Sequence, residues 1–139
     1  MFDFALKYFG FLKHIPLFPH LFEAWMKIEK TVTDKNIPDY LDEIEKEVLL
    51  WERTSARIHK FGGIQFDVNK KEIGHIHSNG LLDILFTREI KNELIKNGKV
   101  KDHHVFKNSG WISFRIRKEE DKKTAIALLE KSYQLKIER

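Results

Sequence analysis

The chain has 139 residues, of which 42% are hydrophobic and 33% charged, so it suits one folded domain and argues against bulk disorder. It contains no cysteine, which excludes disulfides, thiolate metal sites, iron–sulfur clusters and a cysteine nucleophile, and leaves seven histidines as the main candidates for chemistry near neutral pH. The net charge of +4 is uneven: residues 31–55 are acidic and residues 56–139 carry +7, which suits a solvated lysine-rich surface, an anionic ligand or nucleic acid.

The first third of the chain has the apolar spacing of helices. Apolar residues recur every three or four positions in 2–12, 21–32 and 39–52, and Asp39 is the expected N-cap of the third helix. We expect residues 1–52 to form a helical arm that packs on the rest of the chain. Because its first helix is apolar around much of its circumference, a homodimer contact and a membrane surface are alternatives.

No uninterrupted apolar run of about 18 residues occurs, so we expect no membrane-spanning helix. The apolar start lacks a basic leading region and a small-residue cleavage site, so it does not match a signal peptide. We therefore expect a cytoplasmic protein.

Short runs typical of strands follow the arm. They cover residues 57–61, 64–68, 73–77 and 81–86, and turn residues separate them, which predicts an antiparallel meander. Within the second run, Gln65 and Asp67 alternate with apolar residues, so we expect a strand with one wet face.

The rest of the chain alternates between helix and strand. Thr87 is the expected cap of a helix that ends at Asn97-Gly98. Two short strands, 103–106 and 111–117, and a helix over 119–134 follow. This order predicts an α+β fold: the helical arm (1–52), then a domain over 53–139 with an antiparallel sheet and two packing helices, one compact unit overall.

Two of the histidines, His75 and His77, share one face of a strand because side chains alternate along it. A two-residue loop at Asn79-Gly80 would set both opposite apolar residues of the next strand. A three-residue loop over 78–80, with glycine in the left-handed conformation, would set His75 opposite Asp83. We favour the second loop, because it keeps the imidazoles off the core face and gives one of them a carboxylate.

A second histidine pair, His103 and His104, is adjacent, so the two side chains face opposite ways. A loop of two or four residues after Phe106 would place His104 on the face of Trp111 and Ser113. We therefore expect His104, with His75 and His77, on one wet face of the sheet.

This face is the candidate site, with a polar surface that lacks any site as the alternative. A histidine would act as general base, an arginine would stabilise an anion, and a tryptophan would form an aromatic wall. The catalytic candidates are His75, His77, His104 and Asp83, and the substrate-binding candidates are Trp111, Arg88, Arg115, Ser113 and His103.

The H-x-H pattern with a later histidine also resembles the ligand set of cupin-type metal sites, and imidazole suits Zn, Fe or Ni. The glutamate expected a few residues after the H-x-H is missing, and the sheet is too small for a jelly roll. We therefore expect no metal, and keep a histidine-ligated metal enzyme as an alternative.

Roughly residues 54–135 resemble the luciferase-like domain family, whose named members are the luciferases of bioluminescent fungi. The resemblance is carried by His75-Ile76-His77, Gly80, Asp83, Phe86, Arg88, Leu94, Gly98, His103-His104, Ser109-Gly110-Trp111, Phe114, Glu120-Asp121, Ala127 and Ser132-Tyr133. It departs at Lys107, where a proline is expected. The resemblance implies oxidation of a small enolic molecule, in the fungi a 3-hydroxy-pyrone, by O₂ without metal, flavin or other cofactor.

The stretch from Gly110 to Phe114, with Ser132-Tyr133, is also similar to YjbR-like α+β proteins, which are often discussed as DNA-binding. A nucleic-acid-binding module is therefore an alternative. The favoured expectation remains a small-molecule ligand in a histidine-lined pocket, acted on by a cofactor-independent, oxygenase-like protein, with no nucleic-acid partner.

Overall fold

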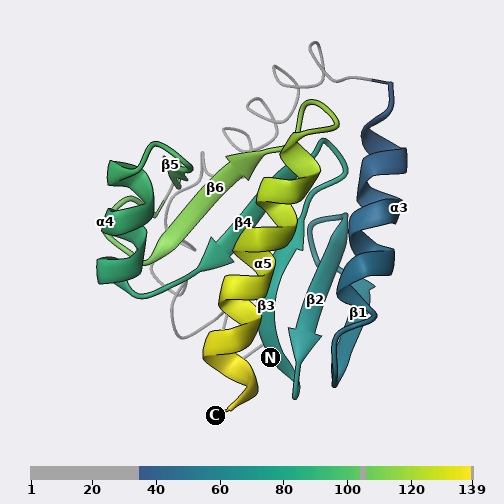
Figure 1. The fold of residues 1–139 in the computed structure, drawn as a ribbon, viewed down its shortest axis with the longest axis horizontal. Coiled ribbons are helices and arrows are strands. Elements are labelled where there is room, and N and C mark those ends of the chain that lie inside the picture. The colour runs from purple at the N-terminus through teal and green to yellow at the C-terminus, as the bar shows by residue number, and fades with distance from the viewer. Residues whose placement is uncertain (1–34, 104–105, 139) are drawn as a thin grey trace, which may run out of the picture. The chain divides into compact units, whose positions relative to one another are not determined.

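The computed structural model describes residues 35–103 and 106–138 (Figure 1). The helices expected over 2–12 and 21–32, and the placement of His104, lie outside these ranges. In chain order the elements are α3 (Ile37–Val48), β1 (Thr54–Ile58), β2 (Ile64–Val68), β3 (Lys71–Ile76), β4 (Leu81–Leu85), α4 (Arg88–Lys96), β5 (Lys101–Asp102), β6 (Trp111–Arg115) and α5 (Asp121–Ile137).

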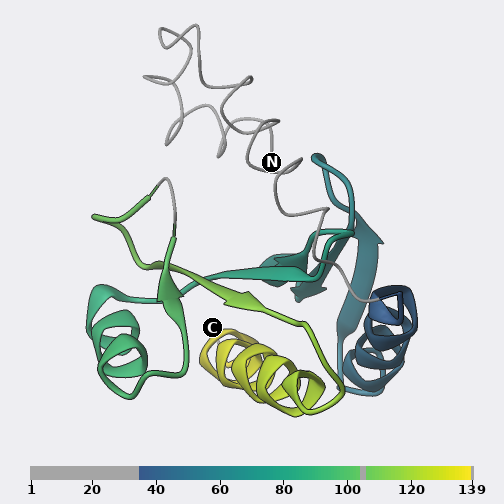
Figure 2. The same cartoon turned by 90° about the horizontal axis from the view of Figure 1, so that it is seen from above.

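The strands form one six-stranded sheet in the order β1-β2-β3-β4-β6-β5, and every neighbouring pair is antiparallel. Helices α3 and α5 lie on the same side of this sheet, and α4 lies beyond its β5–β6 end (Figures 1 and 2). The predicted α+β fold with an antiparallel sheet is confirmed.

The hydrophobic core lies between the sheet and α5. Phe66 on β2, Ile84 on β4 and Ile112 on β6 are fully buried on the side of the sheet that faces the helices, and Leu129 of α5 is fully buried against them. Burial of these side chains removes apolar area from water, which is the main force that holds helix and sheet together. The opposite face of the same strands is left for polar side chains, since residues alternate along a strand.

Helix α3, Ile37–Val48, begins and ends earlier than the sequence predicts. Its N-cap is Asn36, and Asp39 lies in the first turn, so the expected Asp39 cap is wrong. The reason is Pro38, which the first turn accepts because the backbone N–H that proline lacks has no partner there. Ile44 and Val48 are fully buried, and α3 packs against α5, so these residues of the expected arm contribute to the core.

Three strand expectations differ from the structure. The strand expected over 103–106 is wrong, since β5 covers Lys101–Asp102 and neither His103 nor Phe106 lies in a strand. Strand β1 starts three residues earlier than predicted, at Thr54, because it pairs with β2 from Thr54↔Val68 to Ile58↔Ile64. The expected wet face of β2 is wrong, since Gln65 and Asp67 are both 5% exposed. Gln65 Nε2 donates to Asp67 Oδ1 at 2.8 Å, and Arg57 Nε lies 2.8 Å from Asp67 Oδ2, so these polar groups satisfy one another while buried.

The predicted cap of α4 is confirmed: the Thr87 side chain accepts a hydrogen bond from the backbone N–H of Ile90 at 3.3 Å. In the part of the chain that the structure describes, none of the helices has the length and apolar character that crossing a membrane requires.

Gly110 allows the start of β6 to approach the end of β4. A Cβ atom there would lie 1.8 Å from the carbonyl oxygen of Phe86, a backbone atom that cannot move aside. We predict that Gly110→Ala lowers the free energy of unfolding by about 3 kcal/mol in urea titrations. The control is Gly62→Ala, where a Cβ meets nothing within 4 Å and only the left-handed φ of +85° opposes it, at about 1 kcal/mol. Equal losses in the two variants would contradict this packing.

Candidate functional site

The turn between β3 and β4 sets the register of the site. Gly80 has φ +84°, the His77 N–H donates to the carbonyl of Leu81, and the Gly80 N–H donates back to the carbonyl of His77. Asn79 Oδ1 accepts from the backbone N–H of Leu81 at 3.2 Å and stabilises the turn. The favoured three-residue loop is therefore confirmed, and His75 lies directly opposite Asp83.

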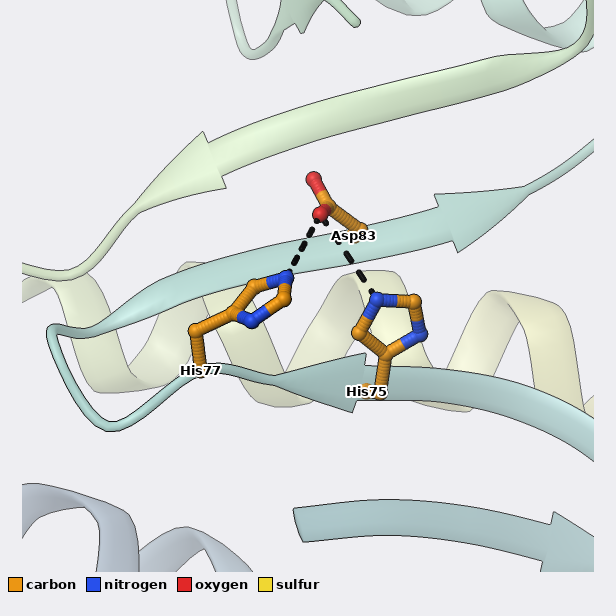
Figure 3. Close-up of side chains that lie close together, drawn as sticks. All are labelled: His75, His77 and Asp83. Carbon is orange, nitrogen blue, oxygen red and sulfur yellow. Dashed lines mark hydrogen bonds and ion pairs between the residues drawn. The ribbon is translucent and has the colours of Figure 1, made fainter. Parts of the chain in front are cut away.

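The side chain of Asp83 is the centre of a cluster of imidazoles on the face away from α5. Its Oδ2 atom lies 3.1 Å from His77 Nε2 and 3.7 Å from the Nε2 atoms of both His75 and His103. Figure 3 shows His75, from β3, and His77, from the segment directly after β3, projecting toward Asp83 on β4. Asp83, His75, His77 and His103 are 2%, 8%, 3% and 6% exposed, so the expected wet face is here a buried polar cluster.

The second oxygen of Asp83 is also engaged. Ser113 lies opposite Asp83 on β6, and its hydroxyl donates to Oδ1 at 2.5 Å. Burial alone would raise the pKa of Asp83, but hydrogen bonds from His103, His75 and His77 outweigh it and hold the pKa well below its usual range. Asp83 is therefore an anion that accepts hydrogen bonds from two neighbouring strands and from His103.

A β-bulge brings a second carboxylate to the cluster. In β3, Gly74 is opposite Phe66 but Glu72 is opposite Asp67, so Ile73 is an extra residue that changes the alternation. Glu72 thereby comes to the same face as His75, and its Oε1 lies 2.6 Å from His75 Nδ1. Plain alternation along the strand would put residues 72 and 75 on opposite faces, so sequence reasoning missed Glu72.

His75 is thus held between two carboxylates. Burial by itself lowers its pKa, but the hydrogen bonds and charges of Asp83 and Glu72 outweigh burial and raise the pKa to about 9. The imidazole of His75 is therefore positively charged at neutral pH in the metal-free protein.

His59, from the loop that joins β1 to β2, stacks on the ring of His75 with centroids 3.9 Å apart and planes inclined by 7°. Burial, with the positive charge of His75, lowers the pKa of His59 to about 4, so it is neutral. The contact of His59 with the cluster could not be predicted from the alternation of residues along β1 and β2, because His59 lies outside both strands.

His103 completes the cluster. It lies directly after β5 and outside any strand. Its Nδ1 accepts from the backbone N–H of Phe106 at 3.2 Å, so the ring proton is on Nε2, which faces Asp83. Trp111 flanks the cluster: its ring centroid is 5.7 Å from that of His75 and 6.0 Å from that of His103. The expectation for His104 stays a prediction.

The two arginines expected at the site lie apart from its centre. Arg115 shares the face of Ser113 but donates through Nη1 to the carbonyl of Asn79 at 3.0 Å. Burial and the charge of Arg117 lower its pKa to about 10, and it remains a cation. Arg88 is exposed in the first turn of α4. Among the described residues, no hydrogen bond or ion pair joins Arg88 to the cluster.

Lys91 anchors the loop that carries the cluster's last members. It is 3% exposed, and its Nζ donates to the carbonyls of Lys107 and Ser109, both at 2.8 Å. The same ammonium lies 2.5 Å from Asp102 Oδ1. One buried cation therefore ties α4 to both sides of the loop between His103 and Trp111.

These groups provide a buried anion, a cation, several N–H donors and an aromatic wall within one face of an α+β domain. His75, His77 and Asp83 also place one nitrogen or oxygen atom each within 4.8 Å of one another, the kind of donor set that could hold a metal ion.

Residues 70–132 match the Luciferase domain family, and this range contains every member of the cluster except His59. This match confirms the resemblance to the luciferase-like domain family that the sequence indicates, over these residues. Searches of curated proteins and of solved structures found no match.

We predict that Lys91→Met lowers the free energy of unfolding by about 2–4 kcal/mol, since it leaves two loop carbonyls and Asp102 without their cation. The tryptophan emission should also shift, because Trp111 follows the loop directly. Lys96→Met, on the exposed side of the same helix, is the matched control and should change neither measurement. An unchanged Lys91→Met protein would show that the loop is held in another way.

Proposed function

We propose that the histidine–aspartate face binds a small enolic or aromatic molecule through its oxygen anion and promotes its reaction with O₂. One observation carries the proposal: Asp83 gathers three imidazoles beside Trp111, within the range that matches the Luciferase domain family. Imidazole N–H groups and a cation suit an enolate, and an indole ring suits a flat ring system.

The proposed reaction needs O₂ as the second reactant and an imidazole of the cluster to transfer a proton. An imidazole of the cluster takes the enol proton, and the enolate carbon forms a C–O bond with O₂. The electron pair of the enolate passes to the new peroxide group, and the proton returns to its terminal oxygen. The product is a hydroperoxide that contains all atoms of the enol and of O₂. Buried N–H donors beside the reacting atoms stabilise the anions on this route.

The test is O₂ uptake by the purified protein with a 3-hydroxy-pyrone as probe. We predict protein-dependent uptake that falls at least about 100-fold in His75→Gln, because that variant removes the positive group facing the anion. Lys60→Gln, which removes an exposed cation from the neighbouring loop, is the charge-matched control and should retain uptake. Circular dichroism and the melting temperature establish that both variants fold.

Two results would contradict the proposal. One is the absence of both O₂ uptake and quenching of tryptophan emission by the probe. The other is equal uptake in the wild type and in folded His75→Gln.

A further inference from the structure

We propose that His75, His77 and Asp83 form a site for a first-row divalent transition-metal ion, with His75 Nε2, His77 Nε2 and Asp83 Oδ2 as ligands. One ligand atom of each residue lies within 4.8 Å of the others, and Asp83 Oδ2 is 3.1 Å from His77 Nε2 and 3.7 Å from His75 Nε2. Ligand atoms bound about 2.0–2.2 Å from one ion lie about 3.0–3.5 Å apart. The two distances to Asp83 are close to this spacing.

Hydrogen bonds around the cluster orient two of the three ligand residues, His75 and Asp83. Glu72 Oε1 holds the Nδ1 side of His75, which fixes the ring proton there and leaves Nε2 for an ion. Ser113 donates to Oδ1 of Asp83, which leaves Oδ2. A carboxylate behind a histidine ligand and a hydrogen bond to a carboxylate ligand are the outer contacts that protein metal sites use to orient their donors.

The same reasoning excludes His103 from the ligands. Its Nδ1 accepts from the Phe106 N–H, so Nε2 carries the proton and has no lone pair for an ion. The protein therefore supplies two imidazoles and one carboxylate and leaves coordination positions open. That donor set suits Fe²⁺, Co²⁺, Ni²⁺ and Zn²⁺, and open positions are the mark of a site that binds substrate.

Charge also favours an ion at this place. Asp83 and Glu72 bring two carboxylates to a cluster whose three ligand residues are at most 8% exposed. A divalent ion balances both carboxylates, and an ion held away from water interacts more strongly with its ligands.

The metal site rests on the proposed function in one respect, namely the class of organic molecule that would bind to the ion. An ion held by three protein ligands keeps open positions, and these would suit a ligand with two neighbouring oxygens, such as a 3-hydroxy-pyrone or a catechol. The ion would supply the positive charge that holds the oxygen anion, and His103 Nε2, 3.7 Å from Asp83 Oδ2, would lie near it as a donor.

The test is metal binding by the full chain without any organic ligand. Protein stripped with a chelator is titrated with Zn²⁺ by calorimetry and with Co²⁺ by visible absorbance. We expect one ion per chain, with Co²⁺ bands of a nitrogen- and oxygen-ligated ion. Glu72→Gln should weaken Zn²⁺ binding about 10- to 100-fold, and His77→Asn should weaken it more than about 100-fold.

His103→Asn is the matched control. It removes a histidine of the same cluster that contacts Asp83 but is not a ligand, so it should weaken Zn²⁺ binding by no more than about 10-fold, far less than His77→Asn. Absence of stoichiometric binding in the wild type would overturn the proposal. So would retention of affinity in folded His77→Asn, or loss of affinity in His103→Asn equal to that in His77→Asn. The O₂ uptake assay of the protein as purified reports separately on the proposed function, so the two can fail independently.

Discussion

The carboxylate of Asp83 is the interaction on which this domain depends. An ionised side chain that is 2% exposed is tolerated only when its charge is matched by donors, and here three imidazole Nε2 atoms and one hydroxyl surround it. These partners come from β3, β6 and the segment after β5, so the charge on β4 fixes how the strands on either side present their side chains. The same oxygen, Oδ2, faces all three imidazoles. The groups that balance the buried charge of Asp83 are therefore also the groups from which the proposed chemistry is argued.

The two faces of the sheet differ in character. The face toward α5 is apolar and holds the fold together, and the opposite face carries the buried polar cluster around Asp83. The bulge at Ile73 serves both faces: it keeps Ile73 fully buried and brings Glu72 to His75. The geometry of one strand therefore serves both the core and the polar cluster.

Much of this arrangement could be predicted from alternation and turn chemistry alone. The Ser78–Gly80 loop and the pairing of His75 with Asp83 follow from the sequence because glycine at a left-handed position sets the register. Glu72 could not be predicted, because a bulge leaves no simple signal in one sequence. His59 and His103 lie outside strands, where no periodicity assigns a face, and the burial of β2's polar residues depends on pairing with Arg57.

The proton positions on the imidazoles test the central role of Asp83 most directly. Long-range ¹H–¹⁵N correlation spectra of the metal-free protein at pH 7 would report them. Convergence on Asp83 predicts a proton on Nε2 of His103, whose Nδ1 accepts from the Phe106 N–H, and protons on both nitrogens of His75, which lies between two carboxylates. A neutral His75 together with a proton on Nδ1 of His103 would contradict the hydrogen-bond network from which both the proposed function and the metal site are argued.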